Sequence, residues 1–211
     1  MTTRRAVRVL LHAVDRKDPS SRRHSERVAH TASFIAGLLD WEPDRVERLR
    51  EAALLHDVGK VGVRSSLLFK TGELSSDERL ELQAHAERGA EIAAQVLTGE
   101  QASWIRAHHE RWDGRGYPDG LVGSRIPEGA RILAVADAWD VMTSRRPYSP
   151  PRRAADALAD CLRNSGSQFW PPAVAALHRA HRLVPLGSRS PAEPPARRAT
   201  SPSRPAPVGA R

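Results

Sequence analysis

The sequence predicts an all-α protein built as a single domain. Apolar residues recur at three- and four-residue intervals through most of the chain, whereas the alternating pattern of a half-buried strand is almost absent. Two helix-start signals agree with this pattern, because Pro43 suits a first helical turn and Ser75 followed by Glu78 has the form of a capping box. The 211 residues are enough to bury one sizeable core.

The helices are expected at intervals along the chain, in the order in which the apolar stripes appear. The third helix begins at Pro43, carries His56 on its stripe and is expected to stop at Gly59, and the fourth aligns His85 with Gly89. In full, we expect helices over about residues 3–14, 24–39, 43–58, 76–96, 100–111, 127–143, 152–163 and 171–183.

Residues 187–211 differ in composition from the rest of the chain. They are rich in Pro, Ser, Ala and Arg, with five arginines, one glutamate and few large apolar side chains. Such a segment cannot bury enough apolar surface to offset the entropy lost on ordering. We therefore expect a disordered, basic tail.

The formal net charge of +8 suggests a polyanionic partner, but its distribution argues against one. Much of the excess lies in the tail, and the remainder is spread over the long body of the chain. No reading helix, zinc finger or aromatic-basic platform is apparent, so neither DNA nor RNA is expected to bind.

The sequence also predicts where the protein resides. No apolar run approaches the roughly 18 residues of a membrane span. The apolar stretch near the N-terminus is short and interrupted by Asp15, which argues against a signal peptide, and the single cysteine, Cys161, fits a reducing compartment. We expect a cytoplasmic protein without a membrane anchor.

His56, Asp57 and Lys60 bring an imidazole, a carboxylate and an ammonium within about one helical turn of each other. Neutral imidazole and carboxylate are usual ligands of divalent transition metals. A lone histidine is more often a structural residue, but clustering changes that balance.

His108 and His109 are adjacent, so about 100° would separate them around a helix. Both can serve one site only if two metal ions lie side by side or if the helix breaks there. Two ions roughly 3.5–4 Å apart are a recurring arrangement for phosphoester hydrolysis. Asp137 follows an apolar run and is expected to point inward, whereas Asp140 either supports a ligand or is solvated.

An ordered series of motifs gives the sequence a specific resemblance. The series consists of HSERV at His24, HDVGK at His56, HAERGAEI at His85, and HHERWDGRGYPDGL from His108 followed by IPEGARILAVADAWDVMTSRRPY. Over about residues 7–184 the chain resembles the HD-GYP family of the HD phosphohydrolase superfamily. The resemblance implies an HD-type helical domain with a di-metal centre that hydrolyses the bacterial second messenger cyclic di-GMP to pGpG or GMP. In this interpretation a leading helix occupies residues 1–16, the domain 17–186 and the tail 187–211.

The resemblance also assigns roles to individual residues. It implies two divalent transition-metal ions, with iron or manganese favoured, and it makes Asp57 the bridging ligand. The expected metal ligands are His24, His56, Asp57, His85, His108, His109 and Asp137. Asp57 and Lys60 are the expected catalytic residues. Substrate contacts are expected from Lys60, Gly114, Gly116, Tyr117, Pro118 and Arg146, and Glu110 is expected to support the fold or orient a ligand histidine.

The sequence departs from its relatives at a few positions. Ser20 stands where some members hold a third metal with a glutamate, which favours a two-metal site. Ser149 replaces a lysine that helps bind the ligand in many relatives. Two alternatives therefore stay open: a non-catalytic module that binds a cyclic dinucleotide or a protein, and the same chemistry on another nucleotide. A homodimer, or a protein partner bound through the first helix or the tail, is also compatible with the sequence.

Overall fold

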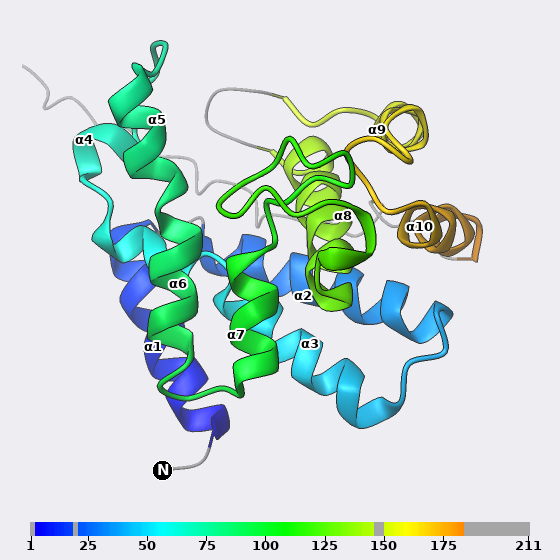
Figure 1. Ribbon diagram of the computed structural model, residues 1–211, viewed down its shortest axis with the longest axis horizontal. Coiled ribbons are helices and arrows are strands. Elements are labelled where there is room, and N and C mark those ends of the chain that lie inside the picture. The colour runs from blue at the N-terminus through cyan, green and yellow to red at the C-terminus, as the bar shows by residue number, and fades with distance from the viewer. Residues whose placement is uncertain (1–2, 19–20, 146–149, 184–211) are drawn as a thin grey trace, which may run out of the picture.

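A computed structural model describes residues 3–18, 21–145 and 150–183 of the chain, and within these ranges the regular structure is entirely helical (Figure 1). Its pairings of β type are two isolated bridges, Asp113 with Val122 and Ser165 with Phe169. The α-helices are α1 (Thr3–Lys17), α2 (Ser21–Leu38), α3 (Pro43–Leu55), α4 (Ser65–Leu68), α5 (Ser76–Gln83), α6 (His85–Ala93), α7 (Gly99–Arg106), α8 (Glu128–Thr143), α9 (Ala154–Arg163) and α10 (Pro171–Leu183). Two short 3-10 helices, η1 (Val58–Gly62) and η2 (Gly123–Arg125), lie in the connections.

The helices pack around α2 and α8. Helix α2 contacts α3, α8, α10 and α1, and α8 also contacts α7, α9 and α10 (Figure 1). Eight residues of α8 are buried, on several sides of the helix, because neighbours surround it. Val28, Ile35, Leu49 and Ile132 are fully buried within one continuous core cluster. The predicted all-α, single-domain architecture is thus confirmed for the described residues.

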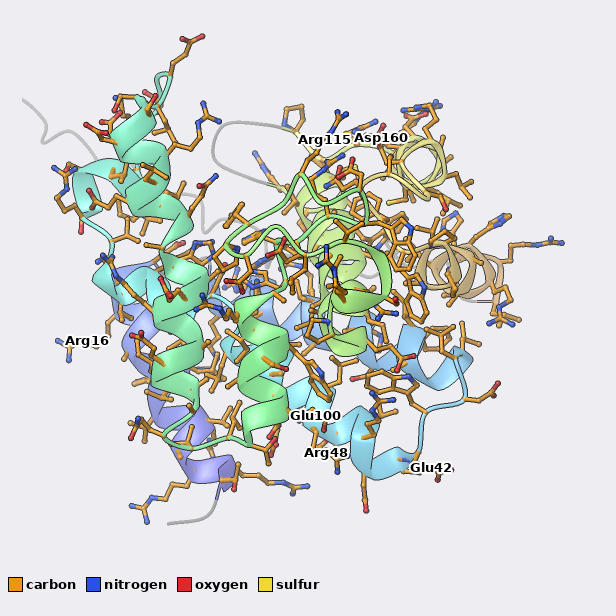
Figure 2. The ribbon with its side chains drawn as sticks, viewed as in Figure 1. Arg16, Glu42, Arg48, Glu100, Arg115 and Asp160 are labelled. Carbon is orange, nitrogen blue, oxygen red and sulfur yellow. The ribbon has the colours of Figure 1, made fainter. Side chains whose placement is uncertain are left out.

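Charged side chains line the outside of this helical body. Figure 2 shows Arg48 of α3 and Glu100 of α7 projecting at the same edge of the molecule, where Arg48 Nε lies 3.7 Å from a Glu100 carboxylate oxygen. Both side chains are exposed by more than a third, so this pair contributes little to stability. No helix in the described part of the chain is long and apolar enough to cross a membrane.

Several predicted helix boundaries were wrong: α1 extends to Lys17 and α2 begins at Ser21, each three residues beyond the prediction. Three further differences are helix breaks that lie beside a histidine. The third helix ends at Leu55 instead of reaching Gly59, which belongs to η1. The helix predicted to run from the capping box to residue 96 is divided at Ala84 into α5 and α6. The helix predicted to reach residue 111 ends at Arg106, so His108 and His109 follow α7. Each break lets an imidazole turn back onto the helix that precedes it.

Several predicted features lie outside the described residues. They are Ser20, Arg146, Ser149 and the tail from residue 187. The leading helix is present as α1, which buries Val7, Leu11 and Val14 in the common core.

Gly59 allows η1 to pack directly on α6. A Cβ atom at Gly59 would lie 2.0 Å from the carbonyl oxygen of His85 and 2.6 Å from the backbone nitrogen of Gly89. Both obstacles are backbone atoms, which cannot rotate away as a flexible side chain would. This close approach brings the segment carrying Asp57 against the start of α6.

We predict that Gly59→Ala lowers the free energy of unfolding by roughly 1–3 kcal/mol or more, because the added methyl group must separate η1 from α6. Gly37→Ala is the matched control, since Gly37 is an exposed position of α2 with nothing within 4 Å of the added Cβ. That control should raise the free energy of unfolding by roughly 0.5–1 kcal/mol. Urea denaturation of both variants provides the measurement. Equal effects of the two substitutions would contradict the proposed close packing.

Candidate metal centre

Five histidines and two aspartates from distant parts of the chain converge at one place in the fold. Helix α2 supplies His24, the turn between α3 and η1 supplies two residues, α6 begins with one, the segment after α7 supplies two, and α8 supplies Asp137. The residues brought together are His24, His56, Asp57, His85, His108, His109 and Asp137. The structure therefore groups all seven of the ligands expected from the sequence.

Asp57 lies at the middle of this cluster. Its Oδ2 is 3.8 Å from His24 Nε2 and 3.5 Å from His56 Nε2, whereas its Oδ1 is 3.4 Å from His85 Nε2. The side chain is only 5% exposed, and Lys60 Nζ donates to Oδ2 at 2.5 Å. The two carboxylate oxygens thus face different histidines.

Two overlapping sets of donor atoms result, and in each set all atoms lie within 4.8 Å of one another. One set contains Asp57 with His85, His108 and His109, and the other contains Asp57 with His24 and His56. Asp137 Oδ1 adjoins the second set at 3.2 Å from His24 Nε2. Asp57 is therefore common to both sets of donor atoms.

Three of the histidines are oriented by the helices that end beside them. The Nδ1 atoms of His56, His85 and His108 lie 2.7, 2.6 and 2.6 Å from the carbonyl oxygens of Ala53, Leu82 and Ile105, each three residues earlier. A carbonyl oxygen only accepts, so each Nδ1 carries the proton. The lone pair of each imidazole therefore lies on Nε2, which is directed into the cluster.

Two of these Nε2 atoms show that the cluster fits a cation. His56 Nε2 and His108 Nε2 are buried and have no hydrogen-bond partner among the described residues. An unpaired buried acceptor is costly, and such atoms in a folded protein call for a functional explanation. Imidazole nitrogens next to carboxylate oxygens suit a divalent transition metal, which would satisfy both atoms.

His24 is oriented by a carboxylate instead of a carbonyl. Its Nδ1 lies 2.7 Å from Asp140 Oδ2, and Asp140 is 3% exposed. Arg27 donates to both oxygens of Asp140, at 2.6 and 3.0 Å, and Ser144 Oγ donates to Oδ1 at 2.9 Å. Of the two interpretations of Asp140 in the sequence, the structure favours the supporting residue. Sequence reasoning missed Arg27 and Ser144, whose only signal is helical spacing from His24 and from Asp140.

The charges of the cluster shift its proton affinities in opposite directions. Burial lowers the pKa of His24, but the carboxylates of Asp137 and Asp140 outweigh it and raise that pKa to about 9. Burial lowers the pKa of His109 to about 4 and lowers the pKa of His85 and of His108 as well. Burial raises the pKa of Asp57, but Lys60 and the neighbouring histidines bring it well below the usual value.

The glycine-rich loop after α7 folds back onto the paired histidines. Gly114 has a φ of +78°, a conformation that favours glycine. A Cβ at Gly116 would lie 2.3–2.6 Å from backbone atoms of residues 109–111, so only glycine permits this approach. Tyr117 stacks on His109 with ring centroids 4.8 Å apart, and Pro118 is exposed next to it.

Glu110 fixes this loop instead of orienting a histidine. Its carboxylate accepts the backbone N–H groups of Asp119 at 2.7 Å and Leu121 at 3.1 Å. Arg106 adds two hydrogen bonds to the carboxylate of Asp119, at 2.8 and 2.9 Å. Of the two roles expected for Glu110, its contacts match support of the fold.

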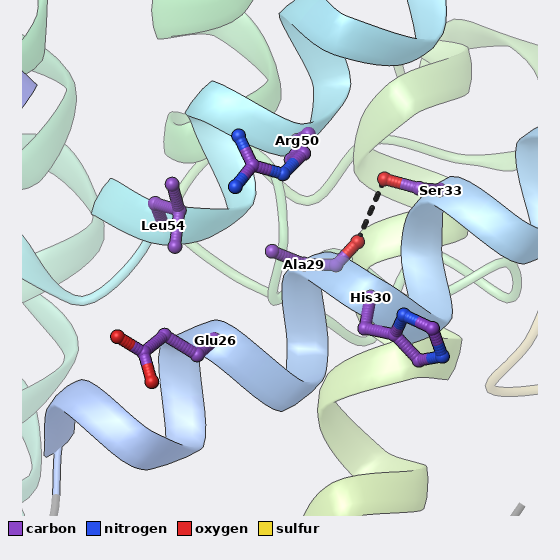
Figure 3. A pocket seen from close by; sticks show the side chains of 6 residues that line it. All are labelled: Glu26, Ala29, His30, Ser33, Arg50 and Leu54. Atoms are coloured by element: carbon purple, nitrogen blue, oxygen red, sulfur yellow. Dashed lines mark hydrogen bonds between the residues drawn. The ribbon is translucent and has the colours of Figure 1, made fainter. Parts of the chain in front are cut away.

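A cavity of about 290 Å³ lies elsewhere, between α2 and α3 (Figure 3). It is lined by Glu26, Ala29, His30, Ser33, Arg50 and Leu54. The lining residues of α2 fall on the face opposite His24, given the helical spacing of about 100° per residue. This cavity is therefore separate from the histidine cluster.

Comparison with known proteins gives consistent matches. Residues 8–173 match the family described as HD domain. The chain is 39% identical over 177 residues to the cyclic di-GMP phosphodiesterase response regulator RpfG of Xanthomonas campestris, covering 81% of this chain and 46% of that protein. It is 40% identical over 174 residues to the 3′3′-cGAMP-specific phosphodiesterase 3 of Vibrio cholerae, covering 82% of this chain and 38% of that protein. The chain thus spans less than half the length of these two relatives.

Solved structures share the fold. A crystal structure of the cyclic GMP-AMP specific phosphodiesterase V-cGAP3 of V. cholerae matches with a TM-score of 0.66 and 22% identity, covering 88% of this chain and 50% of that one. The HD domain of the L. monocytogenes phosphodiesterase PgpH in complex with cyclic-di-AMP matches with a TM-score of 0.53 and 16% identity, covering 82% of this chain and 96% of that one. The match over residues 8–173 and the relatives at 39% and 40% identity show that the chain belongs to the HD domain family, and they confirm the HD-GYP resemblance of its sequence.

Proposed function

We propose that this protein is a metal-dependent phosphodiesterase that hydrolyses cyclic di-GMP to pGpG or GMP. The observation that carries the proposal is the pair of donor sets sharing Asp57, with the buried and unpartnered Nε2 atoms of His56 and His108 directed into them. The names of the relatives support the substrate class, since several are named as cyclic di-GMP phosphodiesterases.

The proposed centre holds two divalent cations, iron or manganese. His24, His56 and Asp137 would serve one ion, His85, His108 and His109 the other, and Asp57 both. When bound, such a pair would act as a Lewis acid on the phosphodiester oxygens. It would also lower the pKa of water, so that hydroxide is available near neutral pH. Ligands of this kind are shared by several metals, so the identity of the ions follows from the family resemblance and from cellular availability.

The remaining residues of the chain bind and orient the substrate in this proposal. The Lys60 ammonium contacts Asp57, and its side chain is 26% exposed, so it can also face a phosphate at the mouth of the centre. Tyr117 and Pro118 would contact the substrate from the loop beside His109. Gly114 and Gly116 set the backbone conformation of that loop. We also assign Arg146 to substrate binding, on the sequence resemblance alone.

A second candidate substrate has specific support. The relative that is 40% identical is named a 3′3′-cGAMP-specific phosphodiesterase, so the same chemistry on a mixed cyclic dinucleotide is the alternative to test. A non-catalytic binding module is the further alternative, and turnover separates it from either enzyme. A homodimer, or a protein partner bound through α1 or the tail, stays a prediction.

We predict that protein purified without oxygen and loaded with Fe²⁺ or Mn²⁺ converts cyclic di-GMP to a linear product. Asp57→Asn should lower turnover by roughly a hundredfold or more, because it removes the negative charge of the carboxylate shared by both proposed ions. Asp156 on α9 lies outside the donor sets and its side chain is 45% exposed, so Asp156→Asn is the matched control and should leave turnover unchanged. Product analysis should include 3′3′-cGAMP in parallel. Saturable binding of both nucleotides by metal-loaded protein without any product would favour the binding module.

We predict that Asp140→Asn weakens metal binding about 10- to 100-fold, since the carboxylate that orients His24 would lose its charge. Arg27→Ala should weaken it less, because Ser144 still bonds Asp140. Calorimetric titration with Mn²⁺ measures both effects. Asp160→Asn is the control, because Asp160 on α9 pairs with Arg152 and Arg163 and lies outside the donor sets. An unchanged Mn²⁺ affinity in Asp140→Asn would contradict the role of Asp140 in orienting His24.

We predict that chelator-treated protein is most stable near pH 6.5. His24 has a pKa of about 9 in the folded protein against an ordinary 6.5. Its contribution to the free energy of unfolding, roughly 3 kcal/mol, is therefore complete below pH 6.5 and is lost as the pH rises to 9. His109 has a folded pKa of about 4, so the unfolded chain takes up its proton first and stability falls, again by roughly 3 kcal/mol, between pH 6.5 and 4.

Urea denaturation of the chelated protein between pH 4 and 9 tests this profile. His24→Gln should flatten the alkaline side and leave the acidic side in place, because only His24 contributes above pH 6.5 in this account. An alkaline side as steep in His24→Gln as in the original protein would show that another group is responsible.

A further inference from the structure

His109 differs from the other histidines of the cluster in how its ring is held. The Nδ1 atoms of the other rings are fixed by Asp140 or by a carbonyl three residues earlier. The hydrogen bond of His109 within the described residues joins its Nε2 to His85 Nε2 at 3.2 Å, which leaves Nδ1 without an anchor. Rotation about χ2 of a histidine is otherwise soft, so a ring without an Nδ1 partner needs another restraint.

An aromatic ring takes the place of that hydrogen bond. Tyr117 lies against His109 with a centroid separation of 4.8 Å and an interplanar angle of 27°, a stacked arrangement. The rings of His108 and His85 also contact the His109 imidazole. Their centroids lie 3.9 Å away in a tilted geometry and 5.0 Å away in an edge geometry. Tyr117 is therefore the one partner outside the donor set that faces the His109 ring in these contacts.

The backbone holds Tyr117 against His109 with little freedom. The Tyr117 N–H donates to the carbonyl oxygen of His109 at 3.3 Å, so the two residues are joined through both backbone and ring. Gly116 packs on the backbone of residues 109–111. Two residues after Tyr117, Asp119 is held by hydrogen bonds with Glu110 and Arg106. Contacts before and after Tyr117 in the sequence thus hold its ring against His109.

We infer that Tyr117 is a positioning residue, whose ring face sets the orientation of His109 in the way that hydrogen bonds set the other imidazoles. This inference rests on the proposed metal centre and deepens it. It assigns the function to the ring and not to the phenol oxygen, and it gives the tyrosine of the loop a role separate from substrate binding.

The test compares variants that keep or remove the ring. Tyr117→Phe retains the stacked face, whereas Tyr117→Leu removes it, and Tyr117→Met is a second ring-free variant with a longer side chain. Phe69→Leu makes the same aromatic-to-leucine change at an exposed position outside the cluster and serves as the control. Thermal denaturation first establishes that each full-length variant is folded.

Calorimetric titration with Mn²⁺ is the first readout. The original protein, Tyr117→Phe and Phe69→Leu should bind alike, and the two ring-free variants should bind one of the ions about tenfold more weakly. Rescue by phenylalanine is the signature of a ring-face interaction. Wild-type affinity in both ring-free variants, or equal weakening in Tyr117→Phe, would overturn the inference.

A readout without metal separates this inference from the proposed function. Carbon-13 relaxation of labelled histidine rings in chelated protein should show a rigid His109 ring in the original protein and in Tyr117→Phe, and a mobile one in the ring-free variants. If the original protein binds no Mn²⁺, the metal centre fails while the relaxation still decides the role of Tyr117. A His109 ring equally rigid in all variants would overturn that role.

Discussion

The hydrogen bond between an imidazole Nδ1 and a helix-end carbonyl is the interaction on which the centre depends. Carbonyls in the last turn of a helix have no partner further along it, so a histidine just beyond the end can satisfy one of them. His56, His85 and His108 each do so, and each thereby has its Nε2 lone pair directed at Asp57 or its neighbours. The same contacts end or interrupt three helices, which explains why helix ends surround the cluster.

The apolar core allows this polar cluster to stay rigid. Helix α8, surrounded by four other helices, carries Asp137 and Asp140 on a frame with eight buried residues. Gly59 lets η1 reach α6, which sets the separation between Asp57 and His85 through backbone contact. The donors are therefore placed by packed elements and by a loop that Glu110 ties down, and preorganised donors need little reordering when a cation binds.

The sequence was sufficient for the helical architecture because apolar residues recur at helical spacing, most clearly in α1 and α9. The residues that converge were named through the resemblance of the motifs to the HD-GYP family, because spacing along the chain does not show which motifs meet in space. The sequence did not predict the helix breaks, because apolar periodicity does not reveal a hydrogen bond between an imidazole and a backbone carbonyl. It also failed for Arg27, which meets Asp140 across 113 residues of chain, and for the stacking of Tyr117, because such pairings depend on the tertiary fold.

Charge balance explains why one histidine of the cluster behaves unlike the rest. Asp57, Asp137 and Asp140 lie close together with little exposure, and uncompensated buried carboxylates are costly. Lys60 neutralises Asp57 and Arg27 neutralises Asp140, whereas the ionic contact of Asp137 in the described chain is His24. A proton on His24 therefore supplies the missing positive charge, on the same Nε2 atom that the proposed metal would use. A divalent cation brings more charge to the same place, so it can displace that proton without leaving Asp137 unpaired.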